Sequence, residues 1–380
     1  MEKLYYLDNA ATTKMFEEEF DLMKKVNDEF FFNPSAAYTK SALEKKQLDS
    51  ARNSILKLLK GFDGKLIFTG SATESNNTVF EGVHIRSGQT VLVSMGEHPA
   101  VFEAAKRLAL KGVNVKYIPL DETGRVDWVQ FEKLMTRDVA FVSIMHVSNE
   151  TGAINEIKKL CAYAKGINKK VLFHSDGVQA FGKIPVNLHD LGVDFYSISA
   201  HKIYGPRGIA ALWIKSGVIC DPLLVGGGQE EGMRSSTENL VGAVAFAYAA
   251  QKVCAEIDQN YNIVSNLKNE LVTKLQVSEI GKYFKVNSAN DSSPYILSVS
   301  FSRIKGEVLM RALENEGVLV STGSACSSKK QGNRILDAMG VSKEDVVGSL
   351  RISFSPYENY DLDVIVETFV KTVDRFEKII

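Results

Sequence analysis

The sequence predicts an α/β protein with a mainly parallel sheet and a second, smaller α+β part. Two observations support this fold class. Apolar strand patterns and helical patterns alternate from about residue 65 to residue 214, which is typical of a parallel sheet covered by helices. A long helical pattern then runs from about residue 241 to residue 275, and we expect this stretch to connect the two parts.

The expected elements follow one another in a regular order. In the first part, strands are predicted over residues 66–69, 90–94, 113–118, 139–144, 171–174 and 195–198, with helices over 99–111 and 154–167. In the second part, strands are predicted over 296–301, 319–320 and 350–354, with helices over 306–316 and 362–379. The short apolar runs of the first part are typical of strands that are buried on both faces of a sheet.

The composition is that of a soluble chain with a large core. The 380 residues are 45% hydrophobic and 24% charged, with a formal net charge of −1, so two lobes are expected. This balance gives no reason to expect direct nucleic acid binding or a membrane surface as the main partner. No apolar run is long enough to span a membrane, and the N-terminus lacks the basic and apolar regions of a signal peptide. We therefore expect a cytoplasmic protein.

The four cysteines form no Cys-x-x-Cys pair and have no metal-ligand spacing to a histidine, so no metal site is expected. Cys161 and Cys254 fall in helical patterns and are interpreted as small core residues, whereas Cys220 adjoins a turn and has no evident role. Cys326 differs, because the Gly, Ser and Lys residues around it can bury little. We expect an exposed thiol there, with nearby lysines that favour the thiolate.

Lys202 is the most informative residue of the chain. It follows His201 at the end of an apolar strand and precedes a Gly-Pro turn, which favours a side chain that projects into a cleft. A lysine holds pyridoxal phosphate as a Schiff base when its amine is desolvated and neutral. The alternative is an ordinary surface lysine in a loop, which is the better explanation of an isolated motif match.

Asp176 and Gln179 follow the predicted strand 171–174 at its carboxyl end, where open α/β sheets bind ligands. A buried aspartate needs a cationic partner, and the protonated pyridine nitrogen of the same cofactor is one. Gln179 is placed to hydrogen-bond the phenolic oxygen of the ring. The alternative for Asp176 is a cap on the next helix.

Residues 70–77 place small and hydroxyl side chains between a strand and a helix. Backbone N–H groups and the helix dipole favour a phosphate in such a segment, and Thr73 adds a hydroxyl donor. The glycine spacings of a Walker loop or a dinucleotide fingerprint are absent. A plain Ser/Thr helix cap explains the same residues.

Together these segments resemble a cysteine desulfurase of the NifS and IscS type, in the class V aminotransferase family of pyridoxal-phosphate fold type I. The resemblance extends from Tyr6 to about Phe376. The motifs that carry it are Tyr6-Leu7-Asp8-Asn9-Ala10-Ala11-Thr12-Thr13, Ala72-Thr73-Glu74-Ser75, Glu97-His98 and residues 143–152, 199–208, 226–230, 232–237 and 321–328. One departure is Asp176-Gly177-Val178-Gln179, where the family has Asp-Ala-Thr-Gln.

The resemblance implies a large domain, residues 14–255, with a mainly parallel seven-stranded sheet that binds pyridoxal 5'-phosphate. Residues 1–13 and 256–380 are then expected to form the small domain, which carries the cysteine segment. A homodimer is also implied, because the residue that matches Thr237 binds the phosphate across the dimer interface.

The functional residues of the family carry over to matching positions of this sequence. The implied catalytic residues are Lys202, Cys326 and His98. The implied cofactor-binding residues are Ala72, Thr73, His98, Asn149, Asp176, Gln179, Ser199, His201, Lys202 and Thr237, and the implied substrate-binding residues are Asn33, Asn149 and Arg351.

Two of these residues have alternative explanations. Arg351 lies among apolar neighbours, so it should be paired, either with the α-carboxylate of an amino acid through two parallel hydrogen bonds or within an internal salt bridge. His98 matches a histidine that stacks on the cofactor ring and serves as the acid/base for the substrate thiol. Its alternative is a buried histidine that is satisfied by the backbone.

The implied reaction converts L-cysteine to L-alanine. Lys202 removes the α-proton, the Cys326 thiolate attacks the substrate sulfur, and a persulfide remains on Cys326. The sulfur then passes to an acceptor protein, such as an iron–sulfur cluster scaffold or a tRNA-thiolation enzyme. The alternatives are a selenocysteine lyase or another class V enzyme, and a catalytically idle sulfur-relay scaffold.

Overall fold

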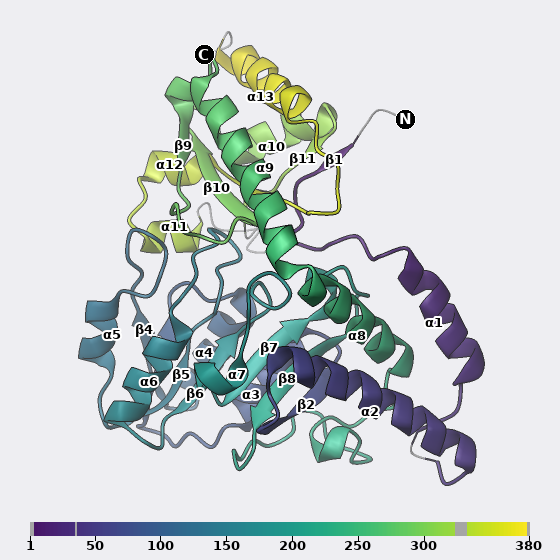
Figure 1. Ribbon diagram of the computed structural model, residues 1–380. Coiled ribbons are helices and arrows are strands. Elements are labelled where there is room, and N and C mark those ends of the chain that lie inside the picture. The colour runs from purple at the N-terminus through teal and green to yellow at the C-terminus, as the bar shows by residue number, and fades with distance from the viewer. Residues whose placement is uncertain (1–3, 35, 324–332, 378–380) are drawn as a thin grey trace.

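The computed structural model describes residues 4–34, 36–323 and 333–377. Its larger part contains a seven-stranded sheet with the strand order β2-β8-β7-β6-β5-β3-β4 (Figure 1). The strands are β2 (Gly64–Thr69), β3 (Thr90–Ser94), β4 (Asn114–Ile118), β5 (Val139–Ser143), β6 (Leu172–Asp176), β7 (Phe195–Ser199) and β8 (Ala210–Lys215). Within this sheet β8 runs antiparallel to both of its neighbours, and the other pairings are parallel. The prediction of a mainly parallel sheet is confirmed.

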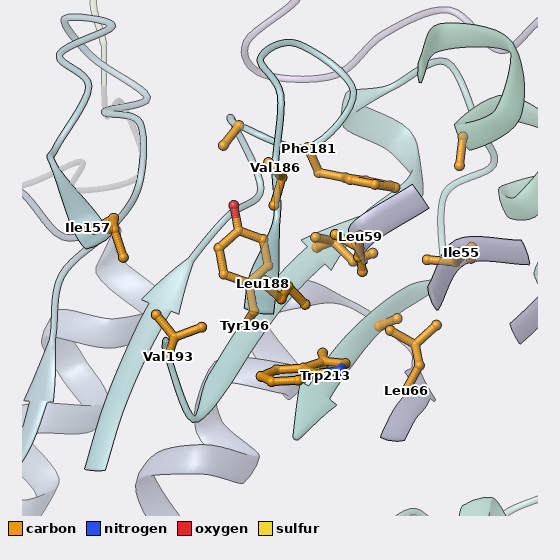
Figure 2. Close-up of a cluster of buried hydrophobic side chains, with 14 of the residues drawn as sticks. Ile55, Leu59, Leu66, Ile157, Phe181, Val186, Leu188, Val193, Tyr196 and Trp213 are labelled. Carbon is orange, nitrogen blue, oxygen red and sulfur yellow. The ribbon is translucent and has the colours of Figure 1, made fainter. Parts of the chain in front are cut away.

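Helices cover both faces of this sheet. They are α1 (Glu18–Glu29), α2 (Thr39–Leu59), α3 (Ala72–Gly82), α4 (Pro99–Leu110), α5 (Trp128–Leu134), α6 (Ile157–Ile167), α7 (Leu188–Leu191) and α8 (Leu240–Ala255). Successive strand residues point to opposite faces, so Leu66 packs with α2 in one core while Ile67 packs with α3 in the other. Figure 2 shows the first of these cores, in which Trp213 and Tyr196 from the sheet lie near Leu59.

The helical stretch predicted over residues 241–275 is confirmed, as two successive helices. Helix α8 ends at Ala255, α9 (Ile257–Val277) begins at once, and their axes differ by 71° (Figure 1). The break lies where the chain leaves the core of the large sheet and enters a second core. There the Tyr357 hydroxyl donates to Glu256 Oε2 at 2.7 Å, which supports the residue between the helices.

The smaller part has its own core and two small sheets. Its elements are β9 (Phe284–Val286), β10 (Ile296–Phe301), α10 (Gly306–Asn315), β11 (Val318–Leu319), α11 (Arg334–Ala338), α12 (Lys343–Val347), β12 (Ser349–Ser353) and α13 (Leu362–Glu377). Strands β12, β10 and β9 form an antiparallel sheet, and β11 pairs with β1 (Tyr5–Tyr6) in parallel. The described residues of this core lie between positions 5 and 10 and between positions 264 and 373. We propose that the two parts are the large and small domains expected from the sequence.

Several boundaries differ from the predictions by one to three residues. The largest shift among the strand-flanking helices is at α6, which begins at Ile157 rather than at Ile154, because Ile154 pairs with Val147 in an isolated β-bridge. Among the described residues no single helix is long and apolar enough to cross a membrane. Helices α8 and α9 reach the length and apolar composition of a membrane span only when they are taken together, and they are bent relative to each other.

The N-terminal segment joins the two parts. Residues after β1 run beside β12, where Ser353 N donates to Leu7 O at 2.7 Å and Ala10 N donates to the Ser353 hydroxyl at 2.8 Å. Farther along, Thr13 N donates to His201 O at 2.9 Å, beyond the end of β7. Residues 8–13 therefore lie between the carboxyl ends of the large sheet and the small sheet.

Candidate active site

Lys202 lies directly after strand β7, in the short 3-10 turn η1 (Ala200–Lys202). Its Nζ donates to the carbonyl oxygens of Ala10 and Ala11, at 2.7 and 2.6 Å. The prediction that this lysine follows a buried strand is confirmed. Its amine is directed at the N-terminal segment, which forms the opposite wall of the candidate site.

Asp176 ends strand β6 and is 4% exposed. Its carboxylate accepts hydrogen bonds from Val178 N at 3.0 Å and from Asn76 Nδ2 at 2.8 Å. The first bond is the local turn cap that was the alternative explanation, but the second comes from helix α3, a hundred residues away. Two neutral donors hold this buried carboxylate, which leaves its charge suited to a cationic ligand.

Gln179 is 3% exposed and reaches the same place as Lys202. Its Nε2 donates to Ala10 O at 2.9 Å, and its Oε1 accepts from Lys183 Nζ at 2.6 Å. The parallel pairing of β6 with β7 brings Asp176, Gln179 and Lys202 to one edge of the sheet. A lysine, a carboxylate and an amide are thus gathered from two neighbouring strand ends.

The start of helix α3 lies beside a cavity of about 240 Å³. Ser71 caps this helix, because its hydroxyl accepts from Glu74 N at 3.1 Å, so the helix-cap explanation holds for Ser71. Ala72 and Thr73 occupy the first turn, where backbone N–H groups lack intrahelical acceptors. The residues that line the cavity are Thr12, Gly70, Ser71, Ser199, His201, Arg207, Gly208 and Ile209. Amides, hydroxyls and a guanidinium are a donor set suited to an anion.

Burial lowers the pKa of both candidate histidines. Burial, followed by the charges of Lys202, Arg207 and Lys183, lowers the pKa of His201 to about 4. Desolvation by the surrounding protein also lowers the pKa of His98, although its ring still reaches solvent across the site.

His98 has a second role as the cap of helix α4. Its Nδ1 accepts from Ala100 N at 3.1 Å, which agrees with the alternative of a histidine satisfied by the backbone. Because Nδ1 accepts, the ring proton of the neutral form is on Nε2. That N–H group is left to donate to a ligand.

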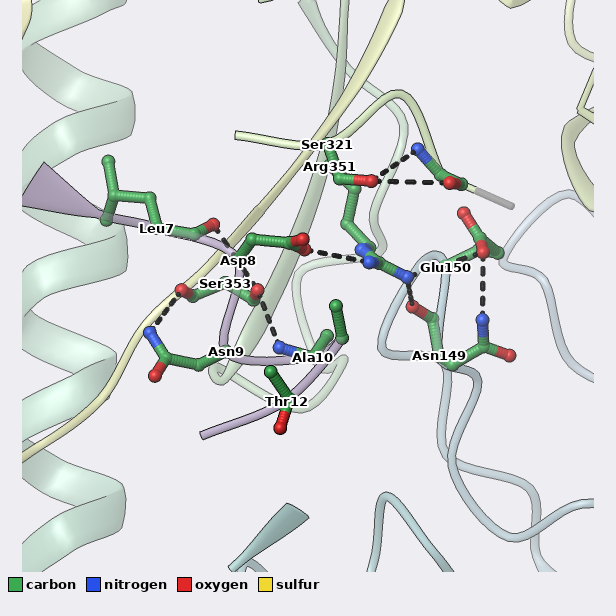
Figure 3. A network of polar contacts seen from close by, with 12 residues as sticks. Leu7, Asp8, Asn9, Ala10, Thr12, Asn149, Glu150, Ser321, Arg351 and Ser353 are labelled. Atoms are coloured by element: carbon green, nitrogen blue, oxygen red, sulfur yellow. Dashed lines mark hydrogen bonds and ion pairs between the residues drawn. The ribbon is translucent and has the colours of Figure 1, made fainter. Parts of the chain in front are cut away.

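Arg351 lies on β12, is 6% exposed and is the centre of the network in Figure 3. Its guanidinium donates to Asp8 Oδ1 at 2.8 Å, to Asn149 O at 2.9 Å and to Glu150 Oε1 at 3.4 Å. The internal salt bridge that was the alternative for this residue is therefore present. Even so, Arg351 Nε and Asn149 Oδ1 are buried without a hydrogen-bond partner among the described residues. Arg351 Nε is a donor, as a carboxylate requires, and Asn149 Oδ1 is an acceptor, as an amino group requires.

Two of the described predicted residues are not brought into this cluster. Asn33 is exposed on the connection between α1 and α2. Thr237 is exposed and precedes helix α8. Cys326 lies outside the described residues. The roles assigned to these three residues stay predictions.

Four residues of the site were missed by the sequence reasoning. Asn76 supports Asp176, Lys183 supports Gln179, and Asp8 and Glu150 pair with Arg351. For Lys183 a local signal existed, because it follows Gln179 by four residues, a spacing that puts two side chains on one face of a helical turn. The partners of Arg351 carry no such signal, since they are 343 and 201 residues away in sequence.

The described cysteines have thiols that burial keeps protonated. Burial raises the pKa of Cys161 and of Cys220 to about 12, and that of Cys254 to about 11. Only a thiolate is a strong nucleophile, so these three residues are poorly suited to attack a substrate. Within the described part of the chain, no group of three or more His, Cys, Asp or Glu side chains is arranged to hold a metal ion.

Residues 5–363 match the family model described as aminotransferase class V. The chain belongs to the class V aminotransferase family. It is 36% identical over 374 residues to the cysteine desulfurase IscS of Dictyoglomus turgidum, a match that covers 96% of this chain and 94% of the relative. It is 34% identical over 375 residues to cysteine desulfurase IscS 1 of Archaeoglobus fulgidus, with 97% of each chain covered.

Two solved structures have the same fold as this chain. A NifS-like protein superposes with a TM-score of 0.88 at 33% identity, over 98% of this chain and 99% of that one. A structure described as SspA in complex with cysteine gives a TM-score of 0.78 at 27% identity, over 93% of this chain. The α/β fold and the family resemblance predicted from the sequence are confirmed.

The departure at Gly177 has a physical reason in this family member. A Cβ built on Gly177 would lie 2.0 Å from Cζ of Tyr196, so the alanine of the related motif does not fit here. The Tyr196 hydroxyl is hydrogen-bonded to His146 Nδ1 at 2.8 Å, which fixes the ring. We predict that Gly177→Ala lowers the free energy of unfolding by about 1–3 kcal/mol or more, as overpacked cores do.

A double-mutant cycle measured by denaturant unfolding checks this prediction. Adding Tyr196→Leu to Gly177→Ala should recover part of the loss, so the two effects should not add. Gly166→Ala is the matched control, because an added methyl group there meets no atom within 4 Å. Strictly additive losses from Gly177→Ala and Tyr196→Leu would contradict the clash.

Proposed function

We propose that this chain is a pyridoxal-phosphate-dependent cysteine desulfurase that converts L-cysteine to L-alanine and retains the sulfur as a persulfide. The observation that carries the proposal is the convergence of Lys202, Gln179 and Asp176 at adjacent strand ends, beside the anion-suited start of α3. The family relatives named as cysteine desulfurases support the substrate class.

The residues present fit pyridoxal phosphate. Lys202 supplies the amine that attaches it, Asp176 supplies the carboxylate for its ring nitrogen, and Gln179 supplies an amide for its ring oxygen. Ser199 and His201 line the cavity suited to its phosphate, and Ala72 and Thr73 lie in the first turn of the helix beside it, with Thr237 expected from a second subunit. Bound there, the cofactor supplies an electron sink for the substrate α-carbon.

Arg351 and Asn149 are the proposed grip on the amino acid. The two parallel hydrogen bonds of a guanidinium match an α-carboxylate, and the buried Nε of Arg351 has no other described partner. Asp8 holds the same guanidinium and is the more exposed of its two carboxylate partners, with 22% of its side chain accessible against 1% for Glu150. The substrate carboxylate is therefore expected to replace Asp8 and to leave Glu150 in place.

Lys202 and His98 are the proposed proton carriers. Lys202 Nζ takes the α-proton of the substrate, and His98 takes the proton of the substrate thiol at Nδ1, which first gives up its hydrogen bond from Ala100 N. The Cys326 thiolate then forms an S–S bond as the Cβ–S bond of the substrate breaks, so L-cysteine and one thiol give L-alanine and one persulfide. Because the described cysteines are kept protonated, Cys326 is the cysteine best suited to this step.

The destination of the sulfur is the finer part of the proposal. An acceptor protein for iron–sulfur cluster assembly or tRNA thiolation is the expected partner, and a cytoplasmic homodimer is the expected form of the enzyme. L-Selenocysteine is the competing substrate to compare, and a chain that forms no yellow complex with the cofactor would instead be a sulfur-relay scaffold.

One experiment tests the function directly. Purified protein is incubated with pyridoxal phosphate and L-cysteine, and alanine and protein-bound sulfane sulfur are measured. The two products are expected in equal amounts. Lys202→Ala is the negative control and should form neither product. Alanine without bound sulfur, or turnover by Lys202→Ala, would refute the proposal.

We predict that Cys326→Ser stays yellow and binds L-cysteine but stops before alanine is released. A serine hydroxyl near neutral pH is far less nucleophilic than a thiolate and cannot hold a persulfide. Single-turnover absorbance and mass spectrometry of the peptide with residue 326 are the measurements. Cys161, Cys220 and Cys254 replaced one at a time should retain activity. Extra sulfur on any of these three would contradict the assignment.

We predict that Arg351→Ala raises the KM for L-cysteine while the cofactor content is unchanged. Loss of a charge-assisted hydrogen bond costs roughly 1.5–3 kcal/mol, which corresponds to a rise in KM of roughly ten- to 150-fold. Arg351→Ala also leaves Asp8 and Glu150 without their cation. Arg351→Lys is therefore compared, because a lysine keeps the charge but cannot make the two parallel hydrogen bonds of a guanidinium.

The control for this prediction is Arg375→Ala, which removes an exposed arginine of α13 that pairs with Glu316. It should leave the KM at the wild-type value. An unchanged KM in well-folded Arg351→Ala and Arg351→Lys would show that Arg351 serves only the internal salt bridge.

A further inference from the structure

Lys183 is a buried lysine next to the proposed cofactor site, and the reaction as described above gives it no role. It is 5% exposed and lies on the turn that follows β6, where its N–H group donates to Ala180 O at 3.0 Å. Its Nζ donates to Gln179 Oε1 at 2.6 Å and lies 5.7 Å from the centre of the Tyr295 ring. The amine is thus enclosed between the large sheet and the small domain.

The surroundings of Lys183 are unfavourable to its charge. Among the ion pairs of the described residues, no carboxylate pairs with it. Burial, together with the charges of Lys202 and Arg351, lowers the pKa of Lys183 to about 7. An apolar side chain of similar length would fill the same space at a lower desolvation cost. The hydrogen bond to Gln179 is therefore what a lysine adds at this position.

That hydrogen bond decides which way the Gln179 amide points. A glutamine amide has a donor end and an acceptor end of almost the same shape, so its orientation follows from its partners. Here Oε1 faces the Lys183 amine and Nε2 faces the carbonyl oxygen of Ala10. A reversed amide would put its NH₂ group against an ammonium and its oxygen against a carbonyl oxygen. The contact between the two oxygens is repulsive whatever the protonation of Lys183, and the other contact is repulsive when the amine is charged.

We infer that Lys183 is a positioning residue that holds the Gln179 amide with its N–H side towards the ring oxygen of the bound cofactor. This inference rests on the proposed function, since it assigns Lys183 a part in the same site. Gln179 is then a hydrogen-bond donor to that oxygen in every turnover. Without Lys183 the amide is held at one end only and can turn its oxygen to the ring.

The polarity of this contact has a measurable consequence. A donor on the ring oxygen withdraws electron density from it, so the oxygen retains the adjacent proton of the yellow chromophore less strongly. The chromophore therefore loses that proton at a lower pH when Gln179 donates. Loss of the donor, or its replacement by an acceptor, should raise the pH midpoint of the visible absorbance.

The test is a double-mutant cycle on the protein loaded with pyridoxal phosphate. The visible absorbance is titrated against pH for the wild type, Lys183→Met, Gln179→Leu and the double variant. We expect Lys183→Met and Gln179→Leu each to raise the midpoint by about one unit, the size expected for one hydrogen bond or nearby charge. The double variant should match Gln179→Leu alone, because Lys183 acts through Gln179.

Lys268→Met is the matched control, since Lys268 is also a buried lysine, 7% exposed, whose Nζ donates to the Ser292 hydroxyl at 2.8 Å within the small domain. It should leave the midpoint unchanged. Gln179→Glu tests the polarity independently of how Lys183→Met folds, because a carboxylate keeps the Lys183 partner but cannot donate. Its midpoint should rise at least as far as that of Gln179→Leu.

Several outcomes would overturn the inference. Shifts of Lys183→Met and Gln179→Leu that add in the double variant would show that Lys183 acts as a direct charge on the ring. A wild-type midpoint in folded Lys183→Met, or a wild-type or lower midpoint in Gln179→Glu, would remove the positioning role. Failure of the wild type to form any yellow complex would instead refute the proposed function, so the two failures are distinguishable.

Discussion

The carbonyl oxygen of Ala10 is the contact on which the geometry of the site depends. It accepts from Lys202 Nζ at 2.7 Å and from Gln179 Nε2 at 2.9 Å, so one backbone atom sets the separation of two side chains from adjacent strands. The N–H group of the same residue donates to the Ser353 hydroxyl at 2.8 Å, next to Arg351 on β12. Because Ala10 contacts Lys202 on one side and Ser353, near Arg351, on the other, a shift of residues 8–13 by one position would break the link between the two parts of the site. The register of residues 5–6 against β11 therefore matters for the chemistry as well as for the fold.

Some buried polar atoms of the candidate site lack hydrogen-bond partners. Arg351 Nε, Asn149 Oδ1 and Asn76 Oδ1 all lack a described hydrogen-bond partner, although each is buried. Leaving such an atom unsatisfied costs about 1–3 kcal/mol, and folded proteins keep few of them. A ligand bound beside Asp176 and Arg351 would give these three atoms partners, although other unpaired buried atoms, such as Glu19 Oε1 and Thr372 Oγ1, lie elsewhere in the described part of the chain. The well-packed cores on either side, with Trp213 and Phe301 fully buried, provide the stability that offsets this cost.

The parts of the fold and site that depend on local sequence could be predicted. The strand ends predicted at residues 174 and 198 lie within two residues of the observed ends, Asp176 and Ser199, because short apolar runs stop there at polar residues. Contacts between distant segments could not be inferred in this way. The bond from Arg351 to Asp8 spans 343 residues, and nothing near either residue specifies the other. The break at Glu256 was missed for a related reason, since no Pro or Gly marks it and its cause is the passage of the chain from one core to another.

Tyr196 shows how a motif can change while the site it serves is kept. Its ring occupies the space where a Cβ on residue 177 would lie, so glycine at that position and tyrosine on the neighbouring strand form one packing unit. The hydroxyl is hydrogen-bonded to His146, whose pKa burial lowers to about 4, so this histidine stays neutral and the contact persists across the physiological range. The backbone of His146 in turn donates to Asp176 O at 2.9 Å. The Tyr196 ring therefore supports the backbone of Asp176 through His146. A smaller residue at position 196 would leave room for alanine at 177 but would give up the hydrogen bond that fixes this support.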